Sequence, residues 1–83
     1  MKEPSAKVLG LRVAYYRKLH NLTQIQLAER ADISVRYVSL IETGHIKNYP
    51  SISVLGRICE VLNISMSILF SEPFTFISNK EPE

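Results

Sequence analysis

The sequence predicts an all-α domain of five short helices, followed by a short extended tail. Apolar residues recur at helical spacing in five segments, which is the primary sequence signal for amphipathic helices. Ser or Thr precedes each segment, where a helix takes its N-cap, and residues that tolerate the left-handed conformation end most of them. These end residues are Asn21, Asp32, Gly44 and Asn63. Of the 83 residues, 46% are hydrophobic, which is enough for one core and argues against disorder.

The first two helices follow from their caps and their apolar stripes. We expect the first over Ala6–Leu19, with Ser5 as its N-cap. Its inward stripe is Leu9, Val13 and Tyr16. Thr23 opens the second helix, and Gln26 three residues later completes a capping box with it. The inward residues of the second helix are Leu27, Ala28 and Ala31.

A tight turn joins the second helix to the third. The turn is Ala31-Asp32-Ile33, and its middle residue can enter the left-handed region, though less easily than glycine. Ser34 caps the third helix, which runs to about Glu42. Val38 and Ile41 lie four and seven residues after that cap, so both are expected to face the core.

The last two helices are shorter or less regular. Pro50-Ser51 begins the fourth, and Gly56 lies inside it, at a cost of about 1 kcal/mol relative to alanine. The expected buried face of the fourth helix is Ile52, Leu55, Ile58, Cys59 and Leu62. Ser65 caps a fifth helix, which contains Met66, Leu69 and Phe70.

The segment after the fifth helix has a different composition. Pro73 ends helicity, and Phe74–Ile77 has the aromatic and β-branched residues typical of a short strand. We therefore expect one domain over residues 5–70 and a tail over residues 71–83 that serves in packing or dimerisation.

A set of short motifs carries a family resemblance over Leu9–Phe70. The motifs are Leu9-Gly10, Arg12-Val13, Tyr16-Arg17-Lys18, Leu22-Thr23-Gln24, Leu27-Ala28, Ala31, Ile33-Ser34, Tyr37-Val38-Ser39, Ile41-Glu42, Gly44, Pro50-Ser51-Ile52 and Leu69-Phe70. Together they resemble the helix-turn-helix proteins of the Cro and phage-repressor type, the XRE family. The resemblance implies a five-helix, lambda repressor-like domain that binds double-stranded DNA. Asp32 and Ile25 depart from the family, which usually has Gly and an acid there.

In such a domain the third helix lies in the major groove with its N-terminal residues at the base edges. Arg36 is the leading base reader, because its guanidinium can bond guanine O6 and N7 together. Val35 suits contact with a thymine methyl group. The full set of expected base readers is Ser34, Val35, Arg36, Ser39 and Leu40.

Phosphate contacts are expected on both sides of that helix. Thr23 and Gln24 lie at the start of the second helix, where backbone N–H groups and the helix dipole favour an anion. The resemblance implies that Gln24 holds the DNA backbone. Tyr37, Lys47 and Asn48 are the expected contacts on the other side.

The resemblance also implies an ion pair between Arg17 and Glu42. An acid that faced the phosphates would oppose binding, so Glu42 must point inward. Breaking a buried pair strands one charge, at about 3–5 kcal/mol. We therefore interpret both residues as structural.

Charge is unevenly distributed, with a net value of +2. Residues 5–70 carry eight basic and four acidic side chains, whereas residues 71–83 carry one basic and three acidic ones. The basic body, in which Arg12 and Arg17 are included, suits a polyanion on one face.

Composition argues against other classes of function. Cys59 is the only cysteine and is expected to be a small core residue. His20 and His45 are joined by no cluster of acids or cysteines, and no spacing suggests a nucleophile with its base. We expect no metal, no cofactor and no catalysis. Without an apolar run near the ~20 residues of a membrane span, or a signal peptide, a cytoplasmic protein with no membrane partner is expected.

The sequence leads to two hypotheses of function. The first is a transcriptional regulator, a repressor or a restriction–modification-type controller, that binds a two-fold operator through the third helix. The alternative is an antitoxin or a protein-interaction adaptor that reuses the fold.

We also expect a homodimer, because one such domain contacts only half a site. The first helix has a second apolar line, Val8, Leu11, Tyr15 and Leu19. Phe74, Phe76 and Ile77 are candidates to cover it within the same chain. The tail strand could instead pair with its symmetry mate, or the last two helices could meet theirs through Val61, Ile64 and Ile68.

Overall fold

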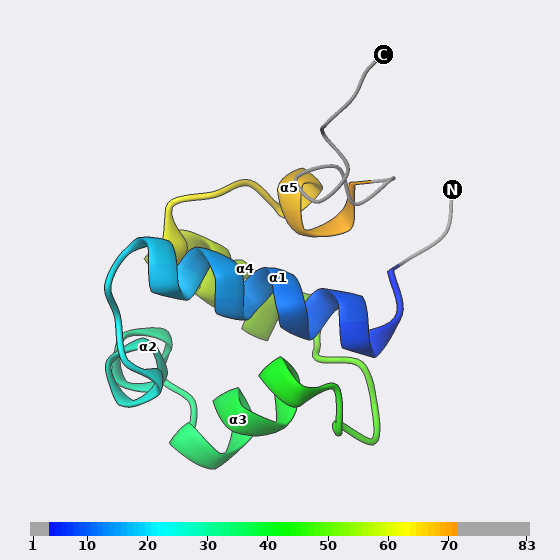
Figure 1. Ribbon diagram of the computed structural model, residues 1–83, viewed down its shortest axis with the longest axis horizontal. Coiled ribbons are helices and arrows are strands. Elements are labelled where there is room, and N and C mark those ends of the chain that lie inside the picture. The colour runs from blue at the N-terminus through cyan, green and yellow to red at the C-terminus, as the bar shows by residue number, and fades with distance from the viewer. Residues whose placement is uncertain (1–3, 72–83) are drawn as a thin grey trace.

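Five helices make up the part of the chain that the computed structural model describes, residues 4–71, as the sequence predicts. They are α1 (Ala6–Leu19), α2 (Gln24–Ala31), α3 (Val35–Thr43), α4 (Ile52–Leu62) and α5 (Met66–Phe70). α1 crosses the middle of the molecule, with α2 and α3 on one side and α5 on the other (Figure 1). The expected strand at Phe74–Ile77 lies outside the described residues. Over the described range, every helix is too short or too polar to cross a membrane.

Side-chain caps fix the start of four helices. The hydroxyls of Ser5, Thr23, Ser34 and Ser51 each accept a bond from the backbone N–H three residues later. Gln26 completes the capping box, because its side chain accepts from the Thr23 N–H at 2.9 Å. The expected side-chain cap at Ser65 does not form. Ser65 occupies the N-cap position of α5, but its hydroxyl bonds to that of Ser67 and makes no cap bond.

Left-handed residues end four of the five predicted segments. Asn21, Asp32 and Asn63 have φ values of 56°, 59° and 57°, and Gly44 has a φ of 77°. The turn between α2 and α3 therefore uses aspartate in a conformation that favours glycine. As a result, only three residues separate the end of α2 from the start of α3.

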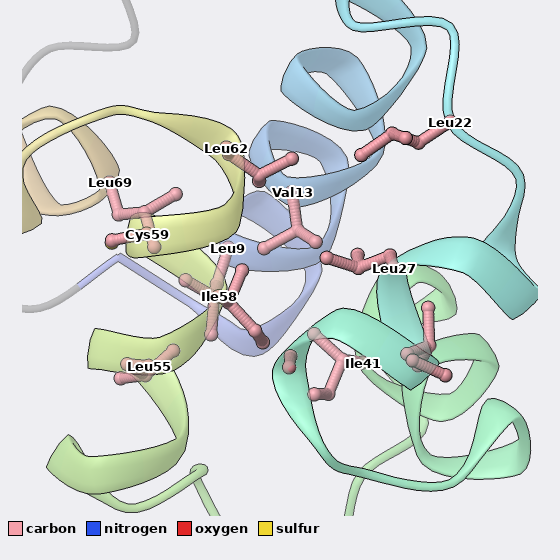
Figure 2. Close-up of a cluster of buried hydrophobic side chains, with 13 residues drawn as sticks. Leu9, Val13, Leu22, Leu27, Ile41, Leu55, Ile58, Cys59, Leu62 and Leu69 are labelled. Atoms are coloured by element: carbon pink, nitrogen blue, oxygen red, sulfur yellow. The ribbon is translucent and has the colours of Figure 1, made fainter.

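One core joins all five helices. Leu9 and Val13 of α1 meet Leu27, Ile41 and Ile58 from the other helices (Figure 2). Leu22, Leu55, Cys59, Leu62 and Leu69 complete the part that Figure 2 labels.

The sequence predicts Ile52 on the buried face of α4, and this prediction is wrong. Its side chain is 72% exposed, whereas Leu55, one turn later, is buried. Ile52 is the first residue of α4. Helical spacing identifies the apolar face, but it does not tell whether a neighbour covers the first turn.

α1 and α3 approach each other through their backbones at Gly10. A Cβ atom added at Gly10 would overlap the carbonyl oxygen of Ile41 and lie 2.7 Å from that of Glu42. Only a residue without a side chain fits at this crossing. Gly10 lies within one of the family motifs, but a helical glycine does not reveal from sequence what packs against it.

Gly56 is the opposite case, and it gives a stability prediction. A Cβ atom added there meets nothing within 4 Å. Gly56→Ala should therefore stabilise α4 by about 0.5–1 kcal/mol, since alanine loses less conformational entropy on folding. In a domain of this size that corresponds to a rise of several degrees in Tm. Thermal unfolding followed by circular dichroism measures it, and an unchanged or lower Tm would contradict the open space at this position.

Candidate nucleic-acid interface

α3 divides its residues between the core and the surface. Val38 and Ile41 are buried, so the opposite side of the helix faces away from the core. Ser34, Val35 and Arg36 are exposed, with Val35 at 44%. Ser39 and Leu40 are half-buried. The most accessible of the expected base readers are therefore the three at the N-terminal end of α3.

The start of α2 presents the two expected phosphate ligands differently. Thr23 is exposed, and its hydroxyl already accepts from the Gln26 N–H at 3.0 Å. Gln24 is half-buried, and its Nε2 donates to Glu42 Oε1 at 2.9 Å. The Gln24 amide is therefore held by the end of α3. Sequence reasoning missed this contact, because Gln24 and Glu42 belong to different elements and no local pattern links them.

The other expected phosphate contacts lie in or near the segment from α3 to α4. Lys47 and Asn48 are exposed there, whereas Tyr37 on α3 is half-buried and packs against the core. This segment lies beyond the end of α3 that is far from the α2–α3 turn (Figure 1). The candidate phosphate ligands therefore flank α3 rather than gather on one side of it.

Arg17 and Glu42 form a paired contact between α1 and α3. Arg17 Nε lies 2.6 Å from Glu42 Oε2, and its Nη2 donates to Oε1 at 3.0 Å. The third donor, Nη1, reaches the carbonyl oxygen of Leu22 at 2.7 Å. The two side chains are 11% and 6% exposed, so water screens the pair little.

The charge count over residues 5–70 includes two arginines that are not available at the surface, Arg17, whose buried pairing was expected, and Arg12, whose burial was not. Arg12 and Arg17 are both buried. Arg12 Nη1 donates to the Leu69 carbonyl oxygen at 2.7 Å, which ties α1 to α5. Arg57 also serves the fold, since its Nε donates to the Ala31 carbonyl oxygen at 2.8 Å. Arg12 lies three residues after Leu9, on the inward side of α1. This spacing indicates that its side chain is buried, which a count of charges does not show.

The basic side chains that stay exposed are the ones available to bind a polyanion. In residues 4–71 the exposed basic side chains are Lys7, Lys18, Arg30, Arg36 and Lys47. Two of them, Arg36 and Lys47, are on the α3 face and its following loop. The only acid of α3, Glu42, is turned inward against Arg17.

Cys59 is part of the core. It is buried, its Sγ lies 3.6 Å from Met66 Sδ, and burial raises the pKa of its thiol above the ordinary value. Among the described residues, no three of His, Cys, Asp and Glu come together as metal ligands would.

Known proteins share both the sequence pattern and the fold. The chain is 36% identical over 75 residues to the immunity repressor protein of Bacillus phage phi105, which covers 90% of this chain and 50% of the repressor. A crystal structure of SinR, the master regulator for biofilm formation, in complex with DNA superposes with a TM-score of 0.69. It is 36% identical and covers 74% of this chain and 95% of that chain.

A third similar protein is the restriction–modification controller protein C.AhdI from Aeromonas hydrophila. Its structure has a TM-score of 0.73 and 25% identity, over 78% of this chain and 96% of that one. The chain spans about half the length of the phage repressor that it matches. A family model described as helix-turn-helix matches residues 13–69, which takes in all of α2, α3 and α4. The chain therefore belongs to the helix-turn-helix family.

Proposed function

We propose that this protein is a sequence-specific DNA-binding transcriptional regulator of the repressor or restriction–modification-controller kind. The observation that carries the proposal is the orientation of α3. Arg36 is exposed on its first turn while Glu42, its only acid, is 6% exposed and paired with Arg17. A helix that presents a cation and hides its acid suits a groove lined by phosphates. The likeness to SinR, solved in complex with DNA, supports this assignment.

The roles of the individual residues follow from their places on this face. Arg36 bonds guanine, and Val35 contacts a thymine methyl, with Ser34, Ser39 and Leu40 beside them. Thr23, Gln24, Tyr37, Lys47 and Asn48 contact phosphates and set the register. The alternative, an antitoxin or adaptor that works only through protein contacts, predicts no selected sequence. Selection of bound fragments from random DNA distinguishes the two.

Arg36→Ala should weaken binding to the selected operator by about 1–3 kcal/mol and relax the preference at one base pair of each half-site. The expected cause is loss of the bidentate bond to guanine. Affinities for the operator and for its single-base variants measure the effect. If both the affinity and the preference stay unchanged, Arg36 is not a base reader.

Lys47→Ala is the matched contrast, because it removes an exposed cation without touching α3. It should weaken all DNA sequences similarly and reduce the slope of log K against log salt by about 1. The two variants therefore separate base readout from phosphate contact.

We further propose that the protein acts as a homodimer in the cytoplasm, bound to half-sites about 10 base pairs apart. Apolar surface for a partner is present on α1, where Leu11 and Leu19 are 49% and 58% exposed. Ile68 on α5 is exposed as well.

Sedimentation equilibrium should give twice the 9.5 kDa chain mass. A chain that ends at Ser71 should give twice its own chain mass if the helices form the interface, and its single chain mass if the tail does. A monomeric full-length chain at the concentrations that saturate the operator would refute the dimer.

A further inference from the structure

The Arg17–Glu42 pair continues into the proposed DNA face through one hydrogen bond. Glu42 Oε1 accepts both from Arg17 Nη2 at 3.0 Å and from Gln24 Nε2 at 2.9 Å. Gln24 is half-buried, and the side chain of Glu42 is 6% exposed. The contact therefore joins a structural pair to a side chain at the entrance of α2.

The chemistry of this contact fixes which way the Gln24 amide faces. An ionised carboxylate only accepts hydrogen bonds, so Gln24 must turn its NH₂ group toward Glu42. One N–H of that group donates to Glu42, and the second N–H on the same nitrogen can donate to another acceptor. Without Glu42, the amide would be free to turn its carbonyl oxygen, which a phosphate repels, to the same place.

The position of Gln24 makes that orientation useful. Gln24 is the first residue of α2, where the backbone N–H groups and the helix dipole also favour an anion. Glutamine has one of the largest side-chain entropies to lose on ordering. An amide that is already ordered in the free protein loses less on binding.

We infer that Glu42 is a positioning residue for DNA binding, one that holds the Gln24 amide with its second N–H ready for a phosphate oxygen. This inference rests on the proposed function of the α3 face. Arg17 has a supporting part, because it neutralises the carboxylate through two hydrogen bonds. A negative charge left unpaired beside the phosphates would oppose binding.

The first test is made on the free, unmodified protein by NMR. The ¹⁵N order parameter of the Gln24 side-chain amide should approach the value of about 0.85 found for rigid backbone. Asn48, an exposed amide of the α3–α4 loop, is the matched control and should be markedly more mobile. A Gln24 amide as mobile as that of Asn48 would overturn the inference, whatever the DNA experiments give.

The second test is a double-mutant cycle on operator affinity. Gln24→Met should weaken binding about tenfold, since a hydrogen bond to a charged group is lost. Glu42→Gln should also weaken binding in the parent protein but have no further effect in the Gln24→Met background. All affinities are measured at a temperature where circular dichroism shows each variant folded.

A merely structural Glu42 would give a different cycle. Its loss would then lower affinity equally in both backgrounds, or in neither, and the inference would fall. Failure of the proposed function is distinguishable, because the unmodified chain would then select no operator at all.

Discussion

Glu42→Ala is expected to destabilise the fold by about 3–5 kcal/mol, because it leaves the Arg17 guanidinium buried without its anion. In the native protein two of the Arg17 donors bond the Glu42 carboxylate, and the third bonds the Leu22 carbonyl oxygen. Alanine keeps only the last of these contacts. A loss of this size is comparable with the whole stability of a small domain. Urea denaturation at fixed temperature measures it directly.

A control on α4 separates the buried pair from a general effect of losing an acid. Glu60 is exposed, so Glu60→Ala should change the free energy of unfolding by no more than about 0.5 kcal/mol. Removing both partners, as in Arg17→Met with Glu42→Leu, should recover part of the loss because no charge is then stranded. An unfolding curve for Glu42→Ala that matches the parent would show that the pair adds nothing to stability.

The helices could be predicted from the sequence because their boundaries are local. A Ser or Thr cap bonds a backbone N–H only three residues away, and Asp32 and Asn63 end their helices through their own backbone conformation. Such features leave a readable pattern in a few consecutive residues. Ser65 shows the limit, since the right residue type at the right position bonds Ser67 instead.

Contacts between distant segments were less predictable. Nothing near Arg12 indicates that its guanidinium bonds the carbonyl oxygen of Leu69, and nothing near Gln24 indicates Glu42. A charge count includes Arg12 in the basic body although its side chain is buried. The exposed side of α3 could be predicted from the sequence, because the helical periodicity that buries Val38 and Ile41 also exposes Arg36.

Gly10→Ala is expected to destabilise the protein by about 3 kcal/mol or more, at the upper end of overpacking effects. The added methyl group would overlap the Ile41 carbonyl oxygen and lie 2.7 Å from that of Glu42. Both obstacles are backbone atoms of α3, so no side-chain rotation relieves them. α1 would have to move away from α3, and this also lengthens the Arg17–Glu42 contact. The higher helix propensity of alanine, about 1 kcal/mol, offsets only part of this loss.

Gly56→Ala is the matched control for this prediction, because it makes the same change inside another helix where a Cβ atom meets nothing within 4 Å. The two variants share the gain in helix propensity and differ only in what surrounds the new methyl group. Their melting temperatures should therefore move in opposite directions from the parent value. If Gly10→Ala melts at or above the parent temperature, the backbones of α1 and α3 do not approach as closely as described. The Arg17–Glu42 pair would then have room to rearrange, and the large effect expected for Glu42→Ala would shrink with it.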